Sequence, residues 1–157
     1  MEYKFKGQRI DNNEFITGSI VVDEIADKYY ITLSVEENGK TGEEGCLKVV
    51  SCEVKKETIS ASTGVKDINK KESYLGDILK EPVYQYSSKK DIEKRENSFG
   101  IVKKYKNSNN FYLEWNFKRK FEGRYFWDTN ELPITHIERY EIVGNIYENP
   151  DMIKKEE

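Results

Sequence analysis

The sequence predicts a mostly-β fold with minor α content, and three observations carry that prediction. Aromatic residues make up 13% of the 157 residues, and most of them are Tyr and Phe. Such side chains pack well on pleated sheets. Runs of β-branched and aromatic residues recur, and turn-forming residues separate them roughly every 8–12 residues, a spacing typical of small barrels rather than βαβ units. The length suits one ordinary domain or two small subdomains packed together.

The first half of the chain contains four strand-like segments. Each is rich in β-branched, aromatic or other apolar residues. They are residues 15–22, 28–35, 46–54 and 57–62. The connection 23–27 is short and polar, so we expect the first two segments to form a hairpin. The segment 37–45 carries three glycines and indicates an exposed loop.

The second half contains four more strand-like segments. They are residues 74–79, 99–105, 111–117 and 137–147. Residues 64–72 are polar and turn-like, and residues 107–110, Asn-Ser-Asn-Asn, have the composition of a hairpin tip. Alternation along 111–117 places four apolar side chains on one face of that strand. They are Phe111, Leu113, Trp115 and Phe117.

Two stretches lack strand character. Residues 81–98 hold almost no core material, so we expect a mobile excursion with one helical turn at 91–95. Pro150 ends the last strand and leaves a tail at 149–157. The expected organisation is an N-terminal β-rich subdomain at 1–62 packed against a second subdomain at 63–148.

Charge and hydropathy argue against several classes of protein. The 26 basic and 29 acidic residues give a net charge of −3, unlike the strongly basic domains of general nucleic-acid coat proteins, although a local basic face remains compatible with it. No run approaches the roughly 18–20 apolar residues of a membrane helix, and the N-terminus has no apolar signal segment. We expect no membrane association and a reducing cytoplasm, with Cys46 and Cys52 as free thiols.

The sequence shows no catalytic or metal-binding pattern. Its one histidine, His136, lies among Ile134, Thr135 and Ile137 with no nucleophile paired to it. The chain has no CxxC, no P-loop, no G-x-G-x-x-G, no H-E-x-x-H and no G-x-S-x-G. We therefore expect a binding protein rather than an enzyme, with no metal and no cofactor.

Three blocks of the chain carry a more specific pattern. Residues 5–18 read FKGQRIDNNEFITG, residues 57–78 read ETISASTGVKDINKKESYLGDI, and residues 141–150 read EIVGNIYENP. In this order, and over nearly the whole chain, they resemble the YopX family of phage and prophage proteins. Two departures stand out, because Phe15 replaces the family's usual Trp and Lys70 replaces a turn glycine. A left-handed conformation is less comfortable for Lys70 than for glycine.

The resemblance implies a small, β-rich protein encoded in a phage-derived region, mostly of low-GC Gram-positive bacteria. It implies no established family-wide activity. Residues 76–78, Gly-Asp-Ile, followed by residues 100–102, Gly-Ile-Val, are similar to the first hairpin of SH3-like barrels. We therefore expect such a barrel over 63–148.

Polar residues in these blocks have structural interpretations beside functional ones. Asp11, Asp67 and Asp77 lie beside turn residues, where a carboxylate accepts hydrogen bonds from the backbone two residues on. We favour this capping role over ligand contact. Arg9 is either an anion-binding arginine or half of an ion pair with Asp11, and the ion pair is favoured.

A basic and aromatic window at 103–127 is the candidate binding surface. It holds seven cations against Glu114 and Glu122, together with nine aromatic residues. Cations beside exposed aromatic faces suit the stacking of bases or nucleotides. The alternative is a solvated hairpin or an oligomer interface, because alternation already assigns part of the window to a core. The candidate ligand-binding residues are Arg9, Lys103, Lys104, Tyr105, Trp115, Lys118, Arg119, Lys120 and Trp127.

Two functions follow as hypotheses. The first is a phage-encoded, non-enzymatic binding protein in the host cytoplasm, a homo-oligomer that acts in counter-defence or host modulation by capturing a host protein or an anionic nucleotide-like ligand. Self-association is expected because the chain has more aromatic material than one small barrel buries. The second is a nucleic-acid-associated module that uses the basic and aromatic hairpin.

Overall fold

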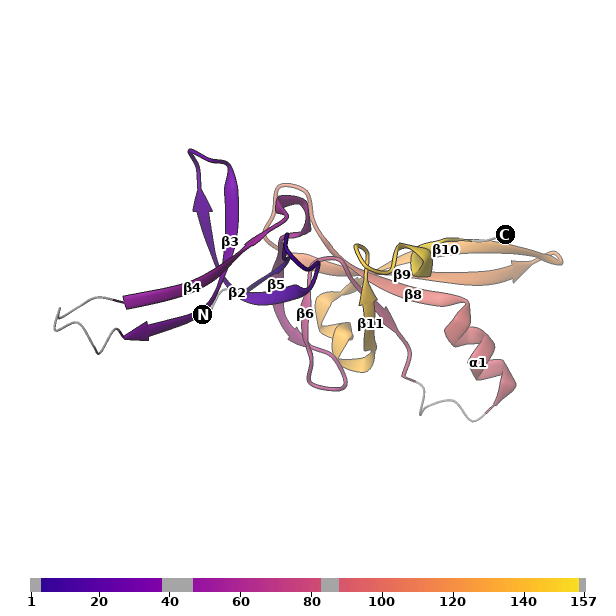
Figure 1. The fold of residues 1–157 in the computed structure, drawn as a ribbon. Helices are drawn as coiled ribbons and strands as arrows, with labels where there is room; N and C mark the ends of the chain where they lie inside the picture. Colours follow the sequence, from indigo (N-terminus) through magenta and orange to yellow (C-terminus); the bar gives the residue numbers. More distant parts are fainter. Residues whose placement is uncertain (1–3, 38–46, 83–87, 156–157) are drawn as a thin grey trace. The chain divides into compact units, whose positions relative to one another are not determined.

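The computed structural model describes residues 4–37, 47–82 and 88–155. The chain divides into two compact units, Met1–Ser62 and Thr63–Glu157 (Figure 1). It is mostly β, with two antiparallel sheets, which confirms the fold class expected from the sequence.

Unit 1 is a meander of short and long strands. β1 (Phe5–Gln8), β2 (Phe15–Asp23), β3 (Lys28–Glu37) and β4 (Leu47–Val54) lie in the order β4-β3-β2-β1, and a 3-10 helix (Lys56–Thr58) leads into β5 (Ser60–Lys66), which pairs with β1. The expected hairpin is confirmed as β2–β3. Asp23 closes its turn, because the carboxylate accepts hydrogen bonds from the backbone N–H groups of Ile25 and Ala26. β1 was not predicted, because its four residues are too few to show alternation.

The core of unit 1 is small. Ile31 and Val54 are its buried apolar side chains among the described residues. Gly7 lies directly under Val54, where an added Cβ would stand 3.1 Å from the Val54 Cβ, a close approach that glycine allows without displacing Val54. Cys52 is a free, half-buried thiol, and Cys46 lies outside the described residues.

Unit 2 is built around a five-stranded sheet in the order β10-β9-β8-β7-β11. Its strands are β7 (Asp77–Lys80), β8 (Ser98–Lys104), β9 (Phe111–Phe121), β10 (Arg124–Pro133) and β11 (Glu141–Asn145). The short β6 (Glu72–Tyr74) lies beside β5, outside this sheet. The remaining elements are α1 (Lys89–Glu96) and two 3-10 helices, Ile134–Arg139 and Pro150–Ile153.

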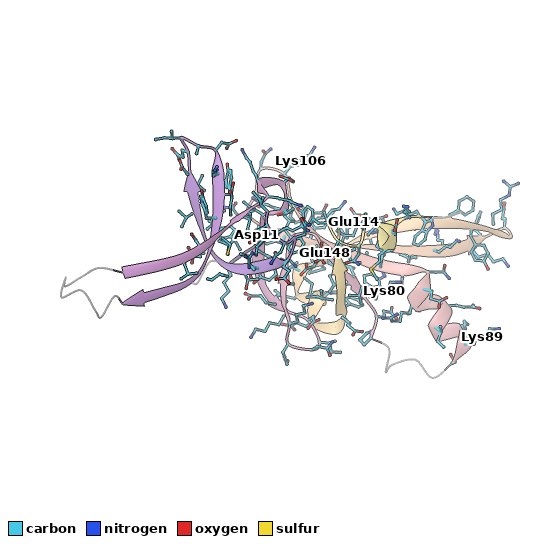
Figure 2. The ribbon with its side chains drawn as sticks, viewed as in Figure 1. Asp11, Lys80, Lys89, Lys106, Glu114 and Glu148 are labelled. Atoms are coloured by element: carbon cyan, nitrogen blue, oxygen red, sulfur yellow. The ribbon has the colours of Figure 1, made fainter. Side chains whose placement is uncertain are left out.

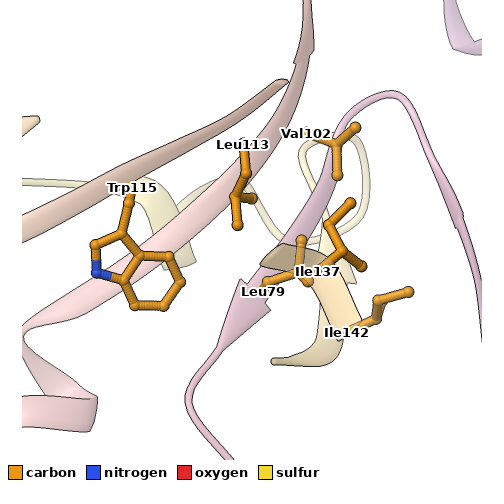
Figure 3. Packing of buried hydrophobic residues seen from close by; sticks show 6 residues of the cluster. All are labelled: Leu79, Val102, Leu113, Trp115, Ile137 and Ile142. Carbon is orange, nitrogen blue, oxygen red and sulfur yellow. The ribbon is translucent and has the colours of Figure 1, made fainter. Parts of the chain in front are cut away.

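Each face of the five-stranded sheet carries its own apolar cluster, because successive strand residues point to opposite faces. One cluster, shown in Figure 3, consists of Leu79, Val102, Leu113, Trp115, Ile137 and Ile142. The other consists of Ile78, Phe99 and Ile101, with partly buried Trp127, Val143, Ile146 and Ile153 packed against it. The segment expected as a tail therefore contributes Ile153, from the second 3-10 helix, to the packing.

Asp67 joins the turn before β6 to β11. Its carboxylate accepts hydrogen bonds from the backbone N–H groups of Asn69 and Lys71, which closes the turn, and from that of Ile142 at 3.0 Å. Lys70 in this turn has the left-handed conformation, with φ of 66°. The favoured capping role of Asp67 is confirmed, and Lys70 adopts the left-handed conformation that suits a lysine less well than a glycine.

Several expectations for the second half need correction. Among the described residues the five strands form an open sheet rather than a closed barrel, because the edge strands β10 and β11 do not pair with each other. The expected strand at 137–147 is shorter, since the 3-10 helix occupies its beginning. In the expected excursion 81–98, α1 is a full eight-residue helix, and residues 83–87 lie outside the described part of the chain. β10 was not predicted at all.

Candidate functional site

The basic and aromatic window predicted from the sequence falls at two separate places along β9. β8 and β9 pair so that Lys104 lies opposite Phe111, which puts Lys103, Lys104 and Tyr105 at the first end of β9. Lys118 lies seven residues beyond Phe111, which in a strand is about 23 Å. The candidate residues of the window therefore do not form one surface.

At the first end of β9, Lys103 is engaged in an ion pair. Its Nζ lies 2.8 Å from Oε2 of Glu114, a residue labelled in Figure 2. Burial alone would raise the pKa of Glu114, but the hydrogen bonds from Lys103 and Asn116 outweigh it and lower that pKa. The ion pair therefore gives Lys103 a structural role within the sheet and does not require a bound ligand.

Lys103→Met is expected to raise the pKa of Glu114, because burial then acts with less opposition. The lowered pKa in the wild type means that ionised Glu114 stabilises the fold at neutral pH, and that this contribution is lost as the pH falls through the folded-state pKa. In the variant, Glu114 should therefore contribute less to the loss of stability in acid. Carboxyl carbon shifts in an NMR titration measure this pKa. Lys104→Met, one residue along on an exposed side chain, is the matched control and should leave it unchanged.

Tyr105 and Lys104 lie beside the hairpin tip at 107–110. The Tyr105 ring packs against that of Tyr112 in a tilted arrangement, with centroids 4.4 Å apart. A hydrogen bond to Glu131 raises the pKa of the Tyr105 hydroxyl. The ring and the hydroxyl group of Tyr105 thus both contact other residues of the same sheet. The Lys104 side chain is exposed.

Trp115 belongs to the core. Its side chain is 8% exposed and stacks on Tyr140, with ring centroids 4.3 Å apart. A ligand does not reach a ring in that position, so Trp115 is removed from the candidate surface. Alternation along β9 was the signal that pointed to this outcome.

Arg9 lies in unit 1 and forms the favoured ion pair. Its Nε and Nη2 donate hydrogen bonds of 2.8 and 2.6 Å to the two carboxylate oxygens of Asp11. The hydrogen bond from Arg9 lowers the pKa of Asp11. This two-pronged contact occupies the guanidinium edge that an anion would need.

At its second end β9 pairs with β10 as a two-stranded ribbon. β8 pairs with β9 only as far as Phe117, whereas β10 accompanies β9 to its end (Figure 1). We name residues 118–127 the arm. Glu122 and Gly123 form its tip with φ of 49° and 77°, as a two-residue hairpin turn with both central φ positive requires.

The two faces of the arm differ in chemistry. Residues directly opposite each other share a face of an antiparallel pair. Lys118 lies opposite Trp127 and Lys120 opposite Tyr125, and these four residues form the lysine face. Arg119 lies opposite Phe126 and Phe121 opposite Arg124, and these four form the phenylalanine face.

On the lysine face the aromatic rings are already in contact with other side chains. The Nζ atoms of Lys118 and Lys120 lie 5.4 and 5.6 Å from the centroid of the Tyr125 ring. Trp127 packs against Phe99, with centroids 5.6 Å apart, and so anchors the base of the arm to the sheet. The ammonium groups of Lys118 and Lys120 thus both make cation–π contacts with the Tyr125 ring.

On the phenylalanine face the rings are open. Phe121 is 62% exposed and Phe126 is 48% exposed. Arg119 contacts Asp128 at 3.2 Å through side chains that are both largely in water. Exposed apolar rings beside arginines make this face the strongest candidate for contact with a partner.

A model of the YopX family, described as YopX protein, matches residues 5–154. The chain belongs to the YopX family. Among solved structures, this YopX chain is similar to protein EF1440 from Enterococcus faecalis, with 21% identity over 98% of this chain and 99% of that chain and a TM-score of 0.47. No curated protein matches it.

The arm of this YopX protein lies outside the three blocks that resemble the family motifs. Those blocks, at 5–18, 57–78 and 141–150, supply turns and caps such as the one at Asp67. Four arm residues were named within the basic and aromatic window but not assigned to a site. They are Phe121, Arg124, Tyr125 and Phe126. Recognising β10 from the sequence would have placed Tyr125 opposite Lys120 and Phe126 opposite Arg119.

Within the described residues, no group of three or more His, Cys, Asp or Glu side chains could hold a metal ion. In the same part of the chain, none of the helices is both long enough and apolar enough to span a bilayer.

Proposed function

We propose that this YopX protein is a non-enzymatic binding protein and that its arm binds nucleic acid. The observation that carries the proposal is the charge of the arm. Its ten residues hold Lys118, Arg119, Lys120 and Arg124 against Glu122, while the whole chain has a net charge of −3. A concentration of cations on one projecting ribbon favours a polyanion over a neutral partner.

The shape of the arm favours a polymer over a nucleotide-like ligand. Small ligands bind in concave sites that cover most of their surface. The most exposed rings of the arm stand on a ribbon, with Phe121 and Tyr125 each 62% exposed. A small nucleotide would stay largely in water there, whereas a nucleic-acid strand adds contacts along the ribbon.

The arm is also narrow for a host-protein partner. Stable protein interfaces use roughly 20–30 residues on each side, and the arm has ten. Action in the cytoplasm of a phage host, in counter-defence or host modulation, remains part of the proposal, and the resemblance to phage and prophage proteins supports it.

The triple variant Lys118→Ala/Arg119→Ala/Lys120→Ala tests the proposal. We expect its affinity for a fluorescein-labelled oligonucleotide, measured by anisotropy at roughly 50 mM NaCl, to fall by about tenfold or more. The slope of log affinity against log salt should shrink by about 2, because three phosphate contacts are lost.

A matched control is Lys89→Ala/Lys90→Ala/Lys94→Ala on α1, which removes the same charge from exposed side chains elsewhere in unit 2. It should bind with near wild-type affinity. Equal losses in both variants would reduce the effect to net charge, and a wild-type protein that binds neither single-stranded nor duplex oligonucleotides at low salt would overturn the proposal.

A further inference from the structure

We infer that the nucleic acid bound by the arm is single-stranded, and that its bases stack on Phe121 and Phe126 of the phenylalanine face. The inference rests on the proposed function and deepens it by naming the form of nucleic acid and the residues that contact the bases. Three features of the arm carry it: the rings that are open, the rings that are not, and the spacing of the open ones.

The rings of Phe121 and Phe126 are available for stacking. They are 62% and 48% exposed. Within the part of the chain that the structure describes, neither ring has an aromatic or cation partner. Leaving two such rings in water is unfavourable, and a flat base that stacks on a ring face covers it.

The aromatic rings of the lysine face are less available for stacking. Tyr125 is as exposed as Phe121, but the ammonium groups of Lys118 and Lys120 lie near its ring, and Trp127 packs on Phe99. These lysines can contact phosphates while their ring partners stay engaged. Bases therefore stack on the phenylalanine face, and the lysine face adds phosphate contacts.

The spacing of the two phenylalanines favours unpaired bases. Arg119 lies opposite Phe126 and Phe121 lies opposite Arg124, so the two rings are diagonal neighbours across the ribbon. Diagonal neighbours in a strand pair lie about 7–8 Å apart. Bases within a duplex strand rise only about 3.4 Å and are closed to side chains by their own stacking, whereas an unstacked single strand can splay successive bases onto separate rings.

The arginines complete the phenylalanine face. Arg119 and Arg124 alternate with the two rings across the strand pair. A backbone that places bases on the rings runs past these guanidinium groups, which suit phosphate oxygens. Arg119 already contacts Asp128 at 3.2 Å, and both side chains are exposed, so a phosphate can compete for this arginine.

The test compares wild type with Phe121→Leu/Phe126→Leu on a single strand of about 12 nucleotides and on a duplex of the same length, by fluorescence anisotropy. Leucine keeps an apolar side chain at an exposed position, so the fold is retained, but removes the aromatic face. We expect wild type to prefer the single strand by about tenfold or more, and the double variant to lose about tenfold or more on the single strand with little change in salt dependence.

The control is Tyr125→Leu, which removes an equally exposed ring from the lysine face. It should change single-strand affinity by less than about threefold. If wild type binds duplex as tightly as single strand, or if the phenylalanine variant binds like wild type while the lysine-arginine triple variant does not, the inference is overturned and the proposed function stands. If wild type binds neither oligonucleotide, the proposed function itself has failed.

Discussion

Asp67→Ala is expected to destabilise unit 2 by about 3–5 kcal/mol. Asp67 is 2% exposed, and its carboxylate accepts hydrogen bonds from the backbone N–H groups of Asn69, Lys71 and Ile142. Alanine leaves these donors without their acceptor. The N–H of Ile142 suffers most, because its hydrogen bond is buried and water does not replace the lost oxygen.

Tryptophan fluorescence during chemical denaturation measures this change, since Trp115 and Trp127, the two tryptophans of the chain, both lie in unit 2. Asp67→Asn keeps the shape but replaces a carboxylate oxygen with an NH2 group, so it should fall between wild type and Asp67→Ala. Asp151→Ala, at an exposed carboxylate, should change stability by less than about 0.5 kcal/mol. A loss of similar size at both alanine variants would contradict the role given to Asp67.

The local half of the Asp67 role could be predicted from the sequence, and the long-range half could not. An aspartate beside turn residues predicts a hydrogen bond to the backbone two residues on, and the Asn69 N–H donates that bond. The bond from Ile142 joins residues 75 apart in the chain. Nothing in local composition specifies which distant strand brings its N–H to this carboxylate.

The strands show the same division between local pattern and tertiary arrangement. Runs of β-branched and aromatic residues identified β2 and β3, and alternation identified the apolar face of β9. β10 escaped prediction because its half that extends into the arm has aromatic residues on both faces, so it has no alternation between a buried and a solvated face. The sequence also could not predict that the sheet is open. Closure of a sheet depends on whether its two edge strands pair, and the sequence of neither edge strand specifies this.

Residue composition identified the candidate site correctly as a stretch of sequence, but not which of its residues share a surface. Counting cations and aromatic residues identified the window 103–127. Register then assigned its members: Lys103 pairs with Glu114, and Trp115 lies in the core, while Lys118 and its neighbours project on the arm. A linear window cannot separate these positions, because one strand carries buried, ion-paired and solvent-facing side chains in turn.

Gly100→Ala is expected to destabilise unit 2 by about 2–3 kcal/mol through overpacking. Gly100 lies on β8 opposite Trp115 of β9. A Cβ there would stand 2.8 Å from Leu113 Cδ1 and 2.8 Å from Trp115 Cε3, well inside contact distance. Trp115 cannot move away freely, since its ring stacks on Tyr140 with centroids 4.3 Å apart, so the strain must spread into the cluster of Figure 3.

A second substitution separates this steric cause from a general intolerance of β8. Leu113→Val removes the Cδ1 atom that the new methyl group meets, so Gly100→Ala/Leu113→Val should be less destabilised than the sum of the two single variants. Gly123→Ala, at the arm tip, adds a methyl group in open space at φ of 77° and should cost only about 1–2 kcal/mol of backbone strain. Strict additivity in the double variant would show that the two groups do not collide, and the close packing of β8 on Leu113 and Trp115 would then not be what holds this face of the sheet together.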